Sequence, residues 1–165
     1  MPDRHQPWAT RLAALAIVAI VGLGCATTPD RLPELDRRFY YNLPTPADQQ
    51  EFLRVADSER QSFLEDKGLW RKWMSLPEEQ RIAAGRGEIQ VGYYEFAVYM
   101  AWGPPADTQT RDVNGRPMLV HTFIRCSSGP KAGRYVRNNL DCDGTSTERQ
   151  VTIRDGVVAE IIYEK

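Results

Sequence analysis

The feature that most constrains this chain is an unbroken run of small and apolar residues from Leu12 to Gly24 (LAALAIVAIVGLG). At 13 residues, the run is too short to cross a bilayer as a helix, which takes about 20. A helix packed on a globular core would carry polar residues on one face, and nothing polar interrupts this run. Arg4 and Arg11 supply the basic head that precedes the apolar centre of a secretory signal. The sequence therefore predicts that residues 1–24 are an export signal.

Cys25 follows the apolar run directly, after Leu23 and Gly24. This ending resembles the lipobox of bacterial lipoprotein signals, in which small residues precede a cysteine that is acylated and becomes the mature N-terminus. The resemblance implies that Cys25 is lipidated and that the chain is held on a membrane by its acyl groups. Gly22 stands where that family usually carries Leu or a similar residue, so ordinary signal cleavage and an uncleaved anchor are the alternatives.

Ala26 bears on which membrane holds the anchor. In the lipoproteins that this signal resembles, a residue other than Asp after the cysteine permits transport to the outer membrane. The resemblance therefore implies an outer-membrane anchor, with the domain facing the periplasm, in a host with two membranes.

The other cysteines predict a disulfide. Of the three cysteines, Cys126 and Cys142 remain once Cys25 is assigned to lipid. In an oxidising compartment such a pair forms a disulfide, and closing a loop of that size contributes roughly 3 kcal/mol. A metal site is the alternative, but His121 is the only histidine beyond the signal and no CxxC or HxxxH spacing is present. We expect a disulfide, and neither a metal nor another cofactor.

Few residues suit catalysis. His121 lies in an alternating run (MLVHTFIR), where a lone histidine is more often a packed or surface strand residue than a general base. Neither a glycine-rich phosphate loop nor a GxSxG elbow is present. The acidic pairs Glu78/Glu79 and Asp141/Asp143 fall in a predicted helix start and a loop. The net charge of −1 gives no basic excess that would favour nucleic acid. We expect a protein that is neither an enzyme nor a nucleic-acid binder.

The chain after the signal predicts a tether and one domain. Residues 25–38 are rich in Thr, Pro and charge, which is typical of a flexible link. Residues 39–165 are enough for a single domain with a core. Helices are expected at about 45–102, where Thr45-Pro46 fits an N-cap followed by proline and Gly103 fits a C-terminal stop. A stripe at helical spacing is expected in the core: Leu69, Trp70, Trp73 and Leu76.

Beyond residue 105 the apolar period changes to two. Strands are expected within about 116–163, at 118–125, 134–140, 148–154 and 157–163. Asp155-Gly156 is a favoured two-residue type I′ turn between the last two. Helices followed by strands predict an α+β fold, in which short N-terminal helices pack on one face of a C-terminal antiparallel sheet.

This order of elements resembles the SmpA/OmlA family of small outer-membrane assembly lipoproteins. The matching residues, within about 88–165, are Gly92, Val98, Trp102-Gly103-Pro104 and Arg154-Asp155-Gly156-Val157. Residues 118–123 stand where that family usually has an aromatic Trp-x-Tyr strand. The resemblance implies a rigid exported scaffold that holds partner proteins, lipid or peptidoglycan near a membrane. It implies no reaction.

A basic group surrounds the expected disulfide loop: Arg125, Lys131, Arg134 and Arg137. Such a group suits an acidic partner or anionic headgroups. A solvated charged hairpin, balanced by Asp141 and Asp143, is the more common explanation of such a group.

The sequence therefore favours an envelope lipoprotein that acts through contacts with an envelope protein. One alternative is a tethered cell-wall-modifying hydrolase that uses carboxylates. Another is a carrier of a small ligand or lipid, lined by aromatic rings: Trp70, Trp73, Tyr99 and Trp102.

Overall fold

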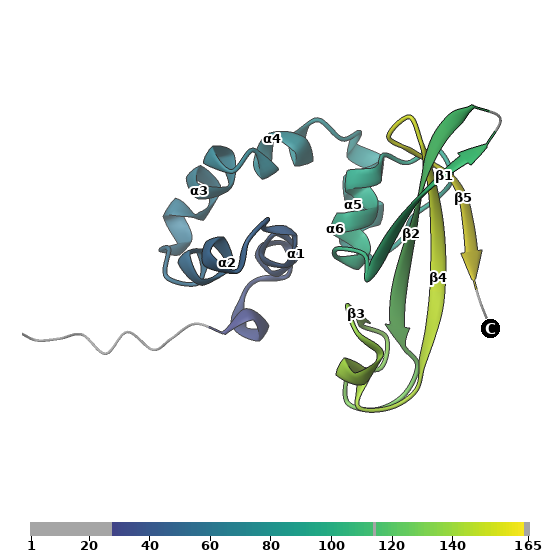
Figure 1. Cartoon of the computed structure of the whole chain (residues 1–165). Coiled ribbons are helices and arrows are strands. Elements are labelled where there is room, and N and C mark those ends of the chain that lie inside the picture. Colours follow the sequence, from purple (N-terminus) through teal and green to yellow (C-terminus); the bar gives the residue numbers. More distant parts are fainter. Residues whose placement is uncertain (1–27, 114, 164–165) are drawn as a thin grey trace, which may run out of the picture.

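The computed structural model describes residues 28–113 and 115–163. Within them, helices are followed by a five-stranded antiparallel sheet, so the α+β fold expected from the sequence is confirmed (Figure 1). The helical elements before the sheet are two 3₁₀ turns, η1 (Pro29–Arg31) and η2 (Asp57–Glu59), and six α-helices: α1 (Glu34–Asn42), α2 (Pro46–Phe52), α3 (Arg60–Asp66), α4 (Leu69–Met74), α5 (Glu78–Gly85) and α6 (Glu95–Trp102).

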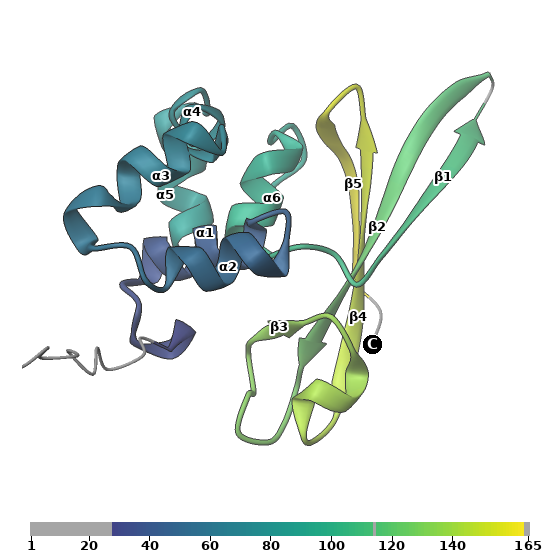
Figure 2. The ribbon, with the colours of Figure 1, turned by 60° about the vertical axis from the view of Figure 1, so that its left-hand side comes forward.

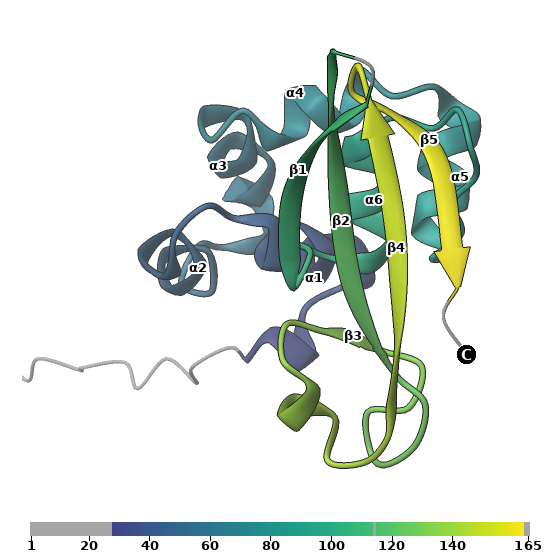
Figure 3. The ribbon, with the colours of Figure 1, turned by 45° about the vertical axis from the view of Figure 1, so that its right-hand side comes forward.

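The sheet has a central strand that pairs along both edges. The strands are β1 (Asp107–Val113), β2 (Arg116–Cys126), β3 (Tyr135–Val136), β4 (Ser146–Arg154) and β5 (Val157–Tyr163), with a 3₁₀ turn η3 (Asn139–Cys142) before β4. The order is β1-β2-β4-β5, and β3 also pairs with β2. Because β4 covers one edge of β2, the strands β1 and β3 share the other edge (Figure 3).

The helices lie on one face of this sheet (Figures 2 and 3). Phe123, Val151 and Val158 from the sheet join one hydrophobic cluster with apolar residues of the helices. The predicted stripe is part of it: Leu69, Trp73 and Leu76 are buried, and Trp70 packs against the cluster. Burial of these large side chains is the main favourable contribution to holding the two layers together.

Local signals set several boundaries as the sequence predicts. The Thr45 hydroxyl accepts a hydrogen bond from the Asp48 amide (3.1 Å) at the start of α2. Helix α6 ends before Gly103, whose φ of 83° suits glycine. Asp155 and Gly156 both have positive φ and connect β4 to β5, as a type I′ turn requires.

Other boundaries differ from the prediction. Helix α1 begins at Glu34, inside the segment expected to be a tether, because its Phe39 is fully buried in the core and Leu32 just before it is buried as well. Strand β1 is an additional strand that the sequence did not suggest. The strand expected at 134–140 is only Tyr135–Val136, since the Asn138 side chain accepts a hydrogen bond from the Leu140 amide and starts the turn η3.

The segment before α6 ties that helix to the sheet. The Gly92 amide donates to the Val158 carbonyl, and the Val158 amide donates to the Tyr93 carbonyl, both at 2.8 Å. The Glu95 amide then donates to the Gly156 carbonyl (2.9 Å). These bonds fix the first residue of α6 beside the β4–β5 turn.

Candidate functional site: an arginine-lined groove

A groove of ≈ 940 Å³ runs between η1 and α1 on one side and the lobe that contains β3 and η3 on the other. This lobe projects from the helical side of the sheet (Figure 2). Cationic side chains outnumber acidic ones along the groove. The eight cations are Arg37, Arg38, Arg86, Arg125, Lys131, Arg134, Arg137 and Arg149, and the three acids are Asp30, Glu34 and Asp141. We call this surface the arginine groove.

The arginine groove contains all four members of the basic group expected from the sequence. Arg125 lies on β2, and Lys131, Arg134 and Arg137 lie between β2 and η3. The other four cations come from α1, from the end of α5 and from β4, so sequence proximity did not group them with the hairpin.

Arg38 has a structural role at the base of the arginine groove. Its guanidinium donates to the carbonyls of Met100 (2.7 Å), Ala101 (2.8 Å) and Gly85 (2.9 Å). These carbonyls belong to the last turns of α5 and α6, where no further helical amide can reach them. Arg38 also pairs with Glu34 at 2.7 Å. It therefore joins three helices rather than offering a free charge.

An aromatic stack forms one wall of the groove. The rings of Trp102 and Tyr135 are nearly parallel, with centroids 4.8 Å apart. The Arg149 guanidinium lies 5.4 Å from the Trp102 ring and donates a hydrogen bond to the Tyr135 hydroxyl (2.7 Å). Burial raises the pKa of Tyr135 to about 12, so its hydroxyl stays protonated and neutral at physiological pH. The wall therefore combines a stacked aromatic pair with the charge of Arg149.

Two more cations are held by local contacts. Arg134 pairs with Asp30 at 3.2 Å, and the Lys131 ammonium donates to the Asp141 carbonyl (2.6 Å). In contrast, Arg37, Arg86, Arg125 and Arg137 take part in no side-chain hydrogen bond or ion pair among the residues that the structure describes. These four, which we call the free arginines, can bind an incoming anion without breaking an existing contact.

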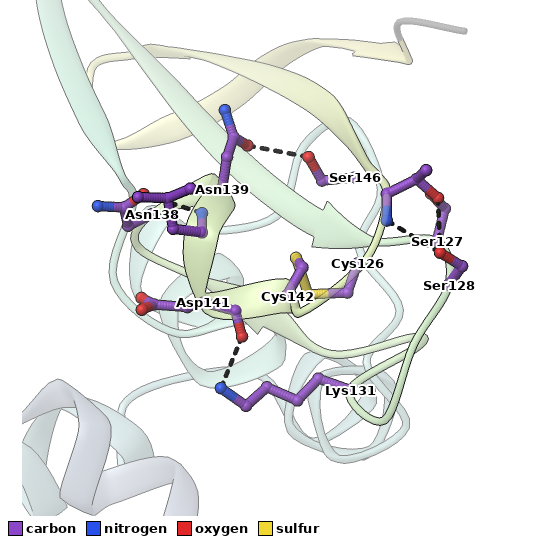
Figure 4. The surroundings of a disulfide bond; sticks show 11 residues. Cys126, Ser127, Ser128, Lys131, Asn138, Asn139, Asp141, Cys142 and Ser146 are labelled. Carbon is purple, nitrogen blue, oxygen red and sulfur yellow. Dashed lines mark hydrogen bonds between the residues drawn. A yellow bond between two sulfur atoms is a disulfide. The ribbon is translucent and has the colours of Figure 1, made fainter.

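A disulfide closes the loop that supplies much of this charge (Figure 4). Cys126 and Cys142 are buried at disulfide distance, with Cα atoms 5.3 Å apart, as the sequence predicts. Lys131, Arg134 and Arg137 all lie between them. The loop is tightly closed, because a Cβ at Gly129 would come within 2.7 Å of the Asp143 carbonyl oxygen.

The predicted lipidation site, Cys25, and the predicted signal 1–24 lie outside the described residues. Among the residues that are described, no helix combines the length and the apolar character that a membrane crossing requires. The first of them that lines the groove is Asp30, five positions after Cys25.

The acidic pairs considered for catalysis do not share a pocket. Glu78 and Glu79 are exposed in the first turn of α5, and Asp141 and Asp143 are exposed around the end of η3. In the arginine groove, Asp30 and Glu34 each pair with an arginine. Within the described part of the chain, no three His, Cys, Asp or Glu side chains gather in a way that could hold a metal ion.

The four rings considered for a ligand cage are packed in different places. Trp70 and Trp73 both contact Phe39, with ring centroids 5.8 and 6.2 Å apart. Trp102 packs edge-on against Phe123 at 5.3 Å. Tyr99 contacts His121, which is buried on β2. These rings stabilise the core and do not surround one shared cavity.

No family model, curated protein or solved structure matches this chain. The resemblance of its short motifs to the SmpA/OmlA family therefore stays a prediction.

Proposed function

We propose that this protein is a lipid-anchored, non-enzymatic interaction module of the cell envelope, and that its arginine groove binds an acidic segment of another envelope protein. The observation that carries the proposal is the excess of eight cations over three acids around one groove. The anchor is Cys25, and an outer-membrane position facing the periplasm follows from Ala26 in a host with two membranes.

The distribution of the free arginines favours an extended ligand. Arg37 comes from α1, Arg86 follows α5, Arg125 lies on β2 and Arg137 follows β3. A single small anion contacts one or two guanidinium groups, whereas a polypeptide with several carboxylates can reach all four. Guanidinium groups bind carboxylates through two parallel hydrogen bonds, which gives such contacts direction as well as attraction.

The composition of the groove is typical of a protein interface. Arginine and aromatic residues are enriched in the parts of interfaces that contribute most to binding, and lysine is depleted. Seven of the eight cations are arginines, and the Trp102–Tyr135 stack supplies an ordered apolar wall. A merely solvated charged surface needs neither the stack nor the preference for arginine.

Pull-down of the full chain from envelope extracts tests this function. The groove variant carries four changes: Arg37→Gln, Arg86→Gln, Arg125→Gln and Arg137→Gln. The matched control changes four exposed arginines outside the groove: Arg54→Gln, Arg71→Gln, Arg111→Gln and Arg116→Gln. The groove variant and the control variant each remove four positive charges, from side chains that form no ion pair in the described residues.

The proposal expects a partner that the wild type and the control retain and the groove variant loses. Equal capture by all three proteins, or no reproducible partner, would contradict it. The anchor is tested separately by the intact mass of the membrane-extracted protein, which reports signal cleavage and acylation together.

A further inference from the structure

A second pocket, of ≈ 600 Å³, lies beside the start of α6 and is lined by none of the residues of the arginine groove. Helix α4 forms one side with Leu69 and Lys72, and α6 forms the other with Glu95, Phe96 and Tyr99. The volume is in the range of sites for small molecules, roughly 300–1,000 Å³.

The wall of this pocket carries a carboxylate that is held in place by two hydrogen-bond donors. The Tyr99 hydroxyl donates to Oε1 of Glu95 (2.5 Å), and Nε2 of His121 lies 2.6 Å from the same oxygen. An ionised carboxylate only accepts hydrogen bonds, so the proton between His121 and Glu95 belongs to Nε2. The Thr108 hydroxyl lies 2.8 Å from Nδ1, the other ring nitrogen, and fixes the orientation of the ring.

This arrangement leaves the second oxygen of Glu95 for a ligand. Among the described residues no hydrogen bond reaches Oε2, and that atom is not one of the buried polar atoms without a partner. The hydrogen bond from His121 lowers the pKa of Glu95, and Tyr99 and the nearby Lys72 lower it further. The carboxylate is therefore ionised at neutral pH and oriented by a buried ring. Such an oriented charge is what a binding site needs before its ligand arrives.

The rest of the lining defines the complementary parts of the ligand. Lys72 is exposed on α4 and offers an ammonium on the same pocket as Glu95. Leu69, Leu76 and Phe96 supply apolar lining, and the Lys72 ammonium lies 6.0 Å from the centroid of the Phe96 ring. Because the pocket carries one charge of each sign, neither a simple cation nor a simple anion satisfies both.

We propose that this pocket binds a small zwitterion with an apolar body, of the amino-acid type, with its ammonium on Glu95 and its carboxylate on Lys72. The binding is independent of the arginine groove, and its failure would leave the proposed function untouched.

The test is an NMR titration of the full chain with three matched probes. L-leucine has both charges, isoamylamine lacks the carboxylate, and isocaproate lacks the ammonium. We expect saturable shifts of Phe96 and Tyr99 signals with L-leucine, and roughly tenfold weaker binding of each of the other two, since each loses a charge-assisted contact.

Two variants assign the contacts, and a third is the control. Lys72→Gln should bind L-leucine no better than it binds isoamylamine, and Glu95→Gln should bind it no better than isocaproate. Arg71→Gln, on the same helix but outside the pocket, should bind L-leucine like the wild type. Lys72 makes no hydrogen bond through its ammonium among the described residues, so its variant tests the site even if Glu95→Gln folds poorly.

Absence of saturable shifts in the wild type would overturn the proposal. So would equal affinities of the wild type and both pocket variants for L-leucine.

Discussion

Arg134, on the disulfide loop, donates a hydrogen bond at 3.2 Å to Asp30, which lies 104 residues earlier in the chain. Asp30 belongs to η1, five positions after Cys25 in the sequence, and Arg134 lies just before β3. The contact joins the start of the described chain to the lobe across the arginine groove. The segment that follows the predicted anchor in the sequence thus contacts the proposed binding surface through Asp30.

Because both partners of this pair are more than half exposed, we expect it to contribute little to stability. Exposed pairs are worth about 0–1 kcal/mol. Asp30→Asn should change the free energy of unfolding, measured in urea, by no more than about 1 kcal/mol. The same change frees Arg134 and should strengthen binding of an acidic peptide. Weaker binding would show that Asp30 orders the groove rather than competing with its ligand.

Arg38 should contribute far more to the stability of the fold than its neighbour Arg37. Arg38→Met removes the donors of three helix-end carbonyls, and we expect a loss of about 2–4 kcal/mol in the free energy of unfolding. Arg37→Met removes no described hydrogen bond and should stay within about 0.5 kcal/mol of the wild type. Equal losses in urea unfolding would mean that the three carbonyls at the ends of α5 and α6 are satisfied in another way.

The disulfide should stabilise the fold and organise the basic loop. Replacing Cys126 and Cys142 together by Ser should lower the free energy of unfolding by about 2–5 kcal/mol. It should also weaken binding by the groove, since the loop carries three of its cations. Peptide mapping by mass spectrometry of the protein isolated from its native host should show the two cysteines linked. Free thiols at both positions would refute the pairing.

The Glu95–His121 contact predicts a specific response to acid. The pKa of Glu95 is lowered in the folded state, chiefly by the hydrogen bond from His121. Its ionised form therefore stabilises the fold above the unfolded pKa of about 4.3, and this contribution is lost as the pH falls through the folded pKa. Between pH of about 7 and about 3, the wild type should lose more unfolding free energy than Glu95→Gln. If the unfolding free energies of the wild type and Glu95→Gln changed with pH in parallel, the stabilising contact between Glu95 and His121 would be contradicted.

Much of the fold is readable from local patterns. Asp155-Gly156 specifies a turn through its backbone preferences, and Gly103 specifies a helix end in the same way. The stripe that includes Trp73 predicts core burial because its spacing is helical. Each of these signals is contained within a few residues of the chain.

The elements that escaped prediction lack such local signals. Every residue of β1 is exposed and its sequence, DTQTRDV, carries no apolar alternation, so only the pairing with β2 makes it a strand. Helix α1 lies in a charged segment, and Phe39 is its one buried residue, so the segment has no apolar stripe that would predict a helix.

The candidate sites also combine residues that local sequence groups with residues that only the fold brings together. The hairpin cations could be grouped from the sequence because they lie close together. Arg37, Arg86 and Arg149 join them only through tertiary packing. In the same way Glu95 and His121 are 26 positions apart, and no local sequence pattern predicts their contact.

We propose above all that the free arginines bind a polypeptide through its carboxylates. The most direct test of this proposal is a calorimetric titration of the full chain with a glutamate-rich peptide, beside the glutamine-rich peptide of the same length. We predict that the wild type and the control variant bind the glutamate-rich peptide, that binding weakens as salt is added, and that the groove variant loses it. Equal binding by the groove and control variants, or equal binding of both peptides, would contradict the account.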